Sequence, residues 1–158
     1  MEFFGHDEVK LDSSGRIKLS QSLHGDFESY SHEALVLFCL PEGALGLYPL
    51  ETWEGMRTKA VSSLEDISSN IVLRRQLRRF GALSQKVTLS RQGRINIPST
   101  FRHYANLEVG TVVLTGVEIG AEIWSPKRWQ SELALIQGHL AKKSESEMIL
   151  DEQIQPLD

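Results

Sequence analysis

Two arginines, Arg16 and Arg94, each follow a glycine at the same place in two similar short segments of the chain. The first segment reads Asp12-Ser-Ser-Gly-Arg16, and the second reads Ser90-Arg-Gln-Gly-Arg94, 78 residues further on. An arginine directly after a tight turn projects a planar set of hydrogen-bond donors, which fits a phosphate group or the O6 and N7 atoms of guanine. The pattern makes the loop in each half of the chain a candidate for anion binding.

The neighbours of the two arginines differ between the loops. Arg16 can pair with Asp12 four residues earlier, so the residues alone leave ion pairing and ligand binding equally open in the first loop. In the second loop Ser90 stands in place of the carboxylate, and Arg91 adds another cation. Anion binding is therefore favoured in the second loop.

The net charge of −4 conceals a strong segregation of charge along the chain. No acidic residue lies between Asp66 and Glu108, and a local field of one sign attracts anions whatever the whole-chain sum. The basic residues of this stretch are Arg74, Arg75, Arg78, Arg79, Lys86, Arg91, Arg94 and Arg102. For the four arginines between positions 74 and 79, the sequence leaves two interpretations open, which are contact with nucleic acid and pairing with acidic residues of a neighbouring subunit.

The usual signatures of enzymes and metal centres are missing from the sequence. There is no Gly-x-x-x-x-Gly-Lys phosphate loop, no Gly-x-Ser-x-Gly turn and no His-Glu-x-x-His pair. The single cysteine, Cys39, cannot build a thiolate zinc site, and its apolar neighbours Phe38 and Leu40 are typical of an inert core position. We expect no catalytic residue, no metal and no cofactor.

Each half of the chain shows the same predicted order of elements. Polar and apolar residues alternate on both sides of each Gly-Arg loop, which predicts hairpins over 8–19 and 86–97. Each predicted hairpin leads into a short helix (20–28 and 98–105), two strands (34–40 with 45–48, and 111–116 with 121–124) and a further helix. The sequence thus predicts an α+β fold of two internal ββαββα repeats that share one core.

Composition divides the chain into four segments. We expect a first unit over 1–60, a basic linking helix over 61–84 whose apolar face includes Ile67, Ile71 and Phe80, and a second unit over 85–138. The tail over 139–158 is acidic and poor in apolar residues, which predicts disorder. The longest apolar run, 34–40, is far shorter than the roughly 18 residues that span a bilayer. With no signal-peptide pattern and one unpaired cysteine, the sequence predicts a cytoplasmic protein without a membrane partner.

Taken together, these motifs resemble the MraZ family of bacterial regulators, which are built from two tandem SpoVT-AbrB-type units. The resemblance covers about residues 1–135 and includes Asp12-Ser-Ser-Gly-Arg16, Leu47-Tyr-Pro-Leu-Glu-Thr-Trp53, Gly93-Arg-Ile-Asn-Ile-Pro98 and Ile123-Trp-Ser-Pro-Lys-Arg-Trp129. It implies a swapped-hairpin AbrB-like β-barrel and a ring-shaped homo-oligomer. It also implies association with the nucleoid and repression of the division and cell wall gene cluster through direct repeats in double-stranded promoter DNA.

The family's DNA-binding motif, Asp-x-x-x-Arg, falls on Asp12 and Arg16 in the first half of this chain and on Ser90 and Arg94 in the second. Ser90 replaces the aspartate of the motif, and Ser20 stands where the family has proline. The complete expected DNA-binding set is Asp12, Arg16, Lys18, Ser90, Arg91 and Arg94. The set expected for oligomer contact or secondary DNA contact is Arg74, Arg75, Arg78 and Arg79.

The sequence therefore predicts a sequence-specific DNA-binding transcriptional repressor. The alternative is an AbrB-fold, antitoxin-like module that binds mainly another protein and contacts DNA secondarily. An antitoxin of that type usually has one hairpin unit and a long tail, whereas this sequence carries two units and a short tail, which disfavours the alternative.

Overall fold

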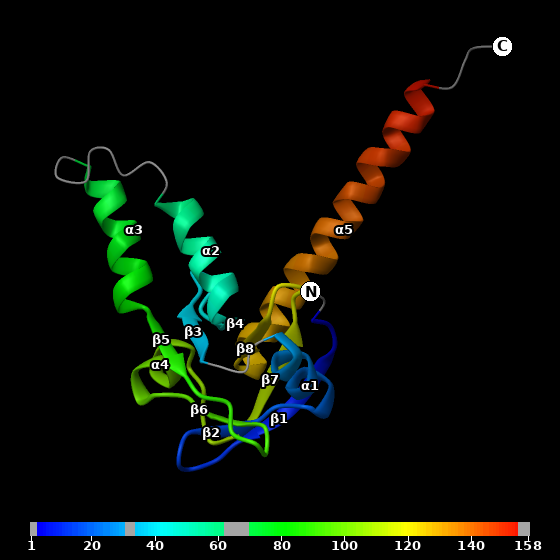
Figure 1. Cartoon of the computed structure of the whole chain (residues 1–158). Helices are drawn as coiled ribbons and strands as arrows, with labels where there is room; N and C mark the ends of the chain where they lie inside the picture. Colours follow the sequence, from blue (N-terminus) through cyan, green and yellow to red (C-terminus); the bar gives the residue numbers. More distant parts are fainter. Residues whose placement is uncertain (1–2, 31–33, 62–69, 155–158) are drawn as a thin grey trace. The chain divides into compact units, whose positions relative to one another are not determined.

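The computed structural model describes residues 3–30, 34–61 and 70–154 (Figure 1). The chain forms two compact units, Met1–Pro126 and Lys127–Asp158, which we describe separately. Strands and helices alternate in the first unit, and the second consists of one helix. The architecture is mixed α+β, in agreement with the predicted class.

The order of elements also agrees with the prediction. The first half contains β1 (His6–Leu11), β2 (Arg16–Lys18), α1 (Gln21–Tyr30), β3 (Leu35–Cys39), β4 (Leu45–Pro49) and α2 (Leu50–Ala60). The second half contains α3 (Ile71–Ala82), β5 (Ser84–Val87), β6 (Arg94–Asn96), α4 (Ser99–Tyr104), β7 (Gly110–Gly116), β8 (Ala121–Trp124) and α5 (Pro126–Ile154).

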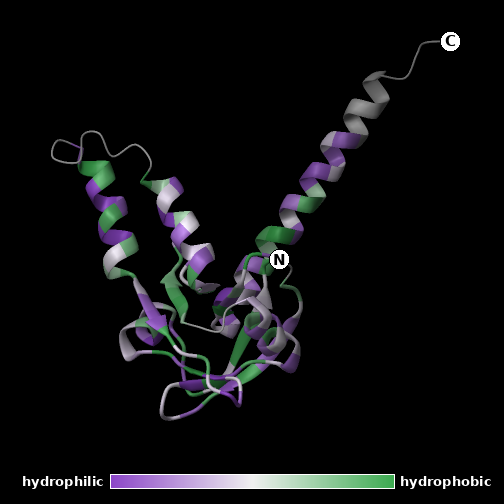
Figure 2. Cartoon of the chain, in the orientation of Figure 1, coloured by the Kyte–Doolittle hydropathy of each residue, from purple (hydrophilic) through white to green (hydrophobic). Residues whose placement is uncertain are grey.

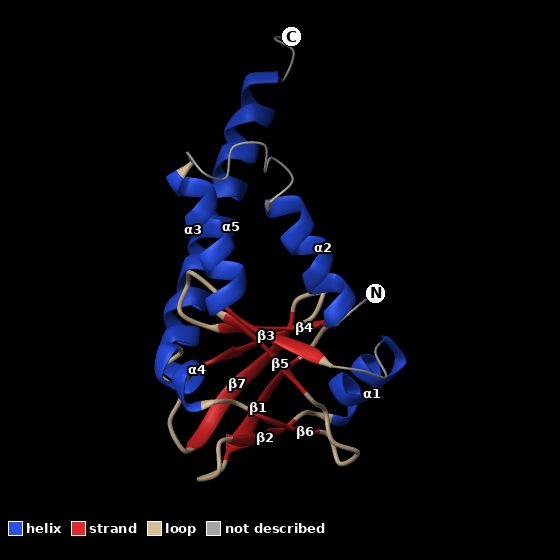
Figure 3. Ribbon diagram, turned by 60° about the vertical axis from the view of Figure 1, so that its left-hand side comes forward, coloured by secondary structure: helices blue, strands red, loops and turns tan. Residues whose placement is uncertain are grey.

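Six strands form an antiparallel sheet in which the two halves of the chain are interleaved (Figure 3). The strand order is β1-β7-β8-β4-β3-β5. The first strand of each half pairs with a strand of the other half, β1 with β7 and β5 with β3. The pairs β3–β4 and β7–β8 lie within one half, whereas β1–β7, β5–β3 and β4–β8 form only when the two halves come together.

The predicted hairpins are wrong in one respect. The tight turn forms in each half, but the strands on its two sides do not pair with each other. Strand β2 pairs instead with β6, as a separate two-stranded antiparallel ribbon. Each of these three-residue strands has one buried central side chain, Ile17 or Ile95, and the register sets the two opposite each other. Alternation along a strand identifies its buried face but not its partner.

The hydrophobic core draws on both halves of the chain, which confirms the predicted shared core. Leu23, Phe27 and Leu47 come from the first half, and Ile97 and Ile123 from the second, and none of these side chains is exposed. Strands β3 and β4 are buried along their whole length. In Figure 2, β3 and β7 carry the green colour of hydrophobic residues.

Cys39 belongs to this core, as predicted. Its side chain is buried and free of any disulfide, and burial raises the pKa of the thiol. The thiolate, which is the reactive form of cysteine, is therefore disfavoured.

Within the described residues, the predicted linking helix is present from Ile71 to Ala82, and its positions 62–69 lie outside the described part of the chain. Helix α3 begins after Asn70, whose side chain accepts a hydrogen bond from the backbone N–H of Leu73 at 3.1 Å. Its buried residues are Leu73 and Phe80, two helical turns apart, whereas Ile71 is 56% exposed. The predicted apolar face is therefore wrong at Ile71, because the helix turns that side chain toward solvent; Ile67 lies outside the described residues.

The prediction of a disordered tail is wrong as far as Ile154. Helix α5 continues without a break from Pro126 to Ile154, and residues 155–158 lie outside the described part of the chain. Good helix formers, namely Ala, Leu, Lys, Glu and Met, dominate the segment 140–150, and Lys143 and Glu147 form an oppositely charged pair four residues apart. These local preferences outweigh the low apolar content. Within the described residues, no helix is both long and apolar enough to cross a membrane.

Candidate nucleic-acid interface

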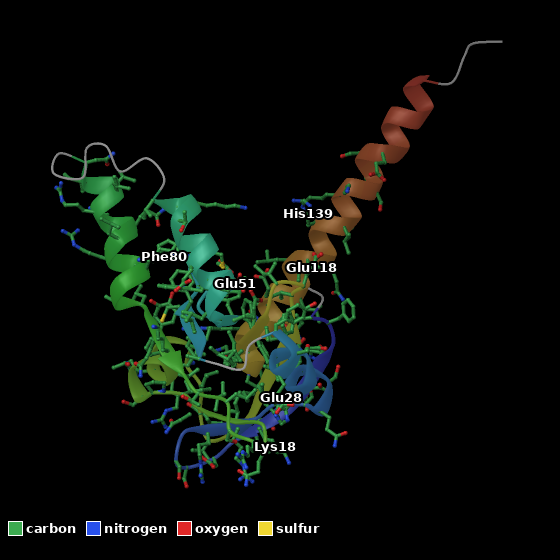
Figure 4. All side chains as sticks on the ribbon, in the orientation of Figure 1. Lys18, Glu28, Glu51, Phe80, Glu118 and His139 are labelled. Atoms are coloured by element: carbon green, nitrogen blue, oxygen red, sulfur yellow. The ribbon has the colours of Figure 1, made fainter. Side chains whose placement is uncertain are left out.

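The β2–β6 ribbon has one apolar face and one basic face. Ile17 and Ile95, which are each 1% exposed, form the inner face. The residues that alternate with them point to the other side, where Arg16 lies opposite Asn96 and Lys18 lies opposite Arg94. These four outer residues are all exposed. In Figure 4, the label Lys18 marks the lower end of the first unit, where nitrogen-bearing side chains project outward.

The first loop is organised by the carboxylate of Asp12. Its Oδ1 atom accepts hydrogen bonds from the backbone N–H groups of Ser14 and Arg16, each at 2.9 Å. Its Oδ2 atom lies 3.2 Å from the Nε atom of Arg16, and both side chains remain about half exposed. The backbone hydrogen bond from Arg16 is the main cause that lowers the pKa of Asp12 below its usual value. The carboxylate thus fixes the turn and the direction of the arginine.

The second loop keeps the same backbone without the carboxylate. The backbone N–H of Arg94 donates to the Ser90 hydroxyl at 3.0 Å, and the N–H of Ser90 donates to the Arg94 carbonyl at 2.9 Å. In the first loop the corresponding bond, from the Asp12 N–H to the Arg16 carbonyl, is 3.0 Å. In the described part of the chain Arg94 has no carboxylate partner, so its guanidinium is available to a ligand. The serine therefore preserves the turn and leaves this arginine unpaired.

The two loops are joined to each other by the backbone. The N–H of Leu19 donates to the carbonyl of Gly93, and the N–H of Ile97 donates to the carbonyl of Gly15, each at 2.8 Å. Gly15 and Gly93 have φ values of 85° and 81°, in the left-handed region that favours glycine. The loops therefore form one connected structure at the end of the ribbon.

Each loop also packs against a side chain from the opposite half of the chain. A Cβ atom at Gly15 would lie 2.9 Å from Cζ of Arg102 in α4, and one at Gly93 would lie 2.8 Å from Nδ1 of His24 in α1. Sequence reasoning did not identify His24 and Arg102 as parts of the site. The sequence held one signal that could have identified them. His24 and Arg102 are 78 residues apart, which is the same spacing as that between the two loops.

Comparison with known proteins decides the family. A family model described as "MraZ protein, putative antitoxin-like" matches residues 82–151. A protein of Treponema pallidum (strain Nichols) is 34% identical over 134 residues, which cover 84% of this chain and 85% of that protein. The chain belongs to the MraZ family. A protein of Dehalococcoides mccartyi (strain BAV1) is 31% identical, over 82% of this chain and 87% of its own length, and both relatives are called "Transcriptional regulator MraZ".

The four arginines for which the sequence left DNA contact and subunit contact open lie on α3, away from the ribbon strands, and they differ in environment. The guanidinium of Arg79 lies over the ring of Phe38, with Cζ 4.8 Å from the ring centroid, and 5.7 Å from the ring of Phe80. Arg75 and Arg78 are exposed, and Arg74 is half-buried and engaged in an interaction of its own. Arg79 thus packs within its own chain, whereas Arg75 and Arg78 present their charge to solvent.

Proposed function

We propose that this member of the MraZ family is a sequence-specific, DNA-binding transcriptional regulator that reads DNA with the outer face of the β2–β6 ribbon. The major groove of B-DNA admits a two-stranded β-ribbon, and a bidentate arginine on guanine is the commonest specific contact there. The observation that carries the proposal is the ribbon register, which sets Arg16, Lys18 and Arg94 on one exposed face. The printed name of the curated relatives supports a regulatory role.

Within this site the residues have different roles. Arg16, Arg91 and Arg94 contact base edges or phosphates, and Lys18 contacts phosphates, because only an arginine offers the planar bidentate fork. Asp12 is not a DNA ligand, since a carboxylate repels phosphate. Asp12 and Ser90 hold the two turns through the bonds to the backbone N–H groups of Arg16 and Arg94. The function proposed is therefore binding and not catalysis.

We infer that residues 1–60 and 85–138 are two repeats joined by the basic segment 61–84, and that together they build a swapped-hairpin AbrB-like barrel. The exchanged pairs β1–β7 and β5–β3 support this, as does the matched hydrogen bonding of the two loops. Such an arrangement gives the ribbon an approximate two-fold symmetry, with one arginine loop from each repeat.

We further propose that the chain acts as a cytoplasmic, nucleoid-associated ring of identical subunits, to whose contacts Arg75 and Arg78 contribute. The ring represses the division and cell wall gene cluster by binding direct repeats in its promoter. One ribbon offers few contacts, so a single site binds in the nonspecific range of about 10⁻⁴ to 10⁻⁶ M. Repeats spaced about 10–10.5 bp apart present the same face of the duplex, and simultaneous binding then gains about 10²- to 10⁴-fold.

Duplexes with one, two or three promoter repeats test the proposed function. Affinity should rise steeply with the number of repeats, and an insertion of about 5 bp, half a helical turn, should abolish the gain. A single repeat bound as tightly as three repeats would contradict simultaneous binding. A three-repeat duplex bound no better than unrelated DNA of equal length would contradict sequence-specific recognition altogether.

The description of the matching family model favours one second candidate, an antitoxin-like module that binds a partner protein. In that case the outer face of the ribbon would be covered by the partner in the complex. A toxin gene beside the gene for this chain, and a copurified toxin that displaces DNA, would support this alternative.

A further inference from the structure

Helix α5 carries a stripe of exposed aliphatic side chains. Leu135, Ile136 and Leu140 are 68%, 41% and 57% exposed. Together with Glu132 and His139 they line a shallow hollow on the surface of the helix. His139 is labelled on this helix in Figure 4. A row of aliphatic side chains in water is unfavourable and marks a surface that is covered by a partner.

The stripe has the spacing of a helix-pairing seam. Glu132, Ile136, His139 and Lys143 follow one another at intervals of four, three and four residues, which keeps them on one face. Leu135 and Leu140 flank this row on its two sides. Most helices in proteins are stabilised by packing of such a face against another element. The seam contains one acidic residue, Glu132, and one basic residue, Lys143. A partner helix must therefore place a basic residue beside Glu132 and an acidic residue beside Lys143.

We propose that the partner is the same stripe of a second copy of this chain, packed in the antiparallel direction. A parallel pair would set Glu132 against Glu132 and Lys143 against Lys143, which is unfavourable at both positions. In an antiparallel pair centred between Gln137 and Gly138, Glu132 of one copy is level with Lys143 of the other. The same centre sets Leu135 level with Leu140 and Ile136 level with His139. One two-fold axis therefore satisfies both the charged and the apolar residues of the stripe.

This surface extends the account beyond DNA recognition. It uses α5 alone and shares no residue with the ribbon or its loops. A contact over a few helical turns is smaller than the standard interface of about 1,200–2,000 Å². The pairing is therefore concentration-dependent, and in an assembly held by other contacts it gains from the high effective concentration of the helices. If other parts of the chain hold several copies together, pairing of α5 helices between two such assemblies doubles the number of copies.

Charge reversal in the full-length chain tests the pairing. Glu132→Lys and Lys143→Glu each create two like-charge contacts per pair, so either change should halve the mass of the assembly measured by light scattering at matched concentration. The double variant exchanges the charges and should restore the original mass. Glu145→Lys, which makes the same change of charge on the opposite side of the helix, should leave the mass unchanged.

Cysteine cross-linking tests the direction of the helices. Oxidation of a mixture of Glu132→Cys and Lys143→Cys chains should produce a disulfide between the two variants, with little self-linking of either alone; Cys39 is buried and stays out of the reaction. Self-linking of each variant would overturn the antiparallel arrangement. An unchanged mass in both charge-reversal variants, or a double variant that fails to recover, would overturn the pairing. Binding of a single-repeat duplex by the ribbon is the separate readout, so loss of pairing is distinguishable from failure of the proposed DNA function.

Discussion

Lys18 of β2 lies directly opposite Arg94 of β6, so that two cations face each other across the ribbon. Like charges in this position destabilise an antiparallel pair by roughly 0.2–1 kcal/mol. Both side chains are exposed, which allows the long stems to diverge in the free protein. A phosphate placed between them converts the repulsion into two favourable contacts. The unfavourable pair in the free chain is thus consistent with an anion as the ligand.

Lys18→Gln should therefore affect stability and binding in opposite directions. Loss of the repulsion should raise the free energy of unfolding by a few tenths of a kcal/mol. Affinity for promoter DNA should fall, with a weaker dependence on salt because one fewer phosphate is neutralised. Urea denaturation and fluorescence anisotropy measure the two effects. Lys142→Gln on α5 is the control for the change in charge. A Lys18→Gln chain that is less stable and binds DNA normally would argue against a phosphate contact.

Substitution of Gly93 should show that His24 limits the space beside the second loop. Gly93→Ala forces a Cβ into the left-handed region, at a cost of about 1–2 kcal/mol, and sets it 2.8 Å from the imidazole. His24→Ala removes the steric part of this cost but not the backbone part. The double variant should therefore be more stable than the sum of the two single effects indicates. Additive losses in thermal denaturation would show that the imidazole moves aside without cost.

The first loop should respond to acid and the second should not. The hydrogen bond from the Arg16 N–H holds the pKa of Asp12 below its usual value of 3.8, so the carboxylate stabilises the folded state at neutral pH. That contribution is present above the usual value and is lost as the pH falls through the lowered one. NMR titration should show the amide of Arg16 shifting in this range while the amide of Arg94, which donates to a hydroxyl, does not shift. The Asp12→Asn variant should abolish the transition at Arg16; its persistence would assign the transition to another group.

Arg79 should contribute to stability and not to DNA binding. Its guanidinium lies over the ring of Phe38, and such contacts contribute about 0.5–2 kcal/mol. Arg79→Ala should therefore lower the midpoint of thermal unfolding, with DNA affinity preserved. Arg75→Ala removes the same charge from an exposed position and should leave stability nearly unchanged. A stable Arg79→Ala chain with weakened DNA binding would reverse this assignment.

The parts of the fold that could be predicted from the sequence are those with local causes. The Gly-Arg turns depend on residues within five positions of each other, and the buried run before Leu40 indicates a strand by itself. The strand partners depend on distant residues, so alternation around Gly15 could not distinguish a hairpin from a ribbon with β6. The continuation of α5 could have been found from helix propensity, but low apolar content was given more weight.

In the candidate site, too, the features with local causes could be predicted from the sequence, and those that depend on distant residues could not. The arginines of the two loops stand out because glycine precedes each of them in a repeated motif. The juxtaposition of Lys18 and Arg94 and the contacts of His24 and Arg102 exist only after the halves interleave. The position of Arg79 over an aromatic ring likewise depends on Phe38, which is distant in sequence. Tertiary pairing therefore decides which basic residues are available to a ligand.

The most direct measurement of the central claim compares two double variants of equal charge. Arg16→Ala/Arg94→Ala removes both loop arginines, and Lys127→Ala/Lys142→Ala removes two exposed lysines from α5. Each bidentate base contact contributes roughly 1–3 kcal/mol, so the loop variant should bind a three-repeat promoter duplex at least about 30-fold more weakly, with its circular dichroism and assembly mass unchanged. The α5 variant should lose far less. Full affinity in the loop variant, or an equal loss in both, would contradict DNA recognition by the ribbon.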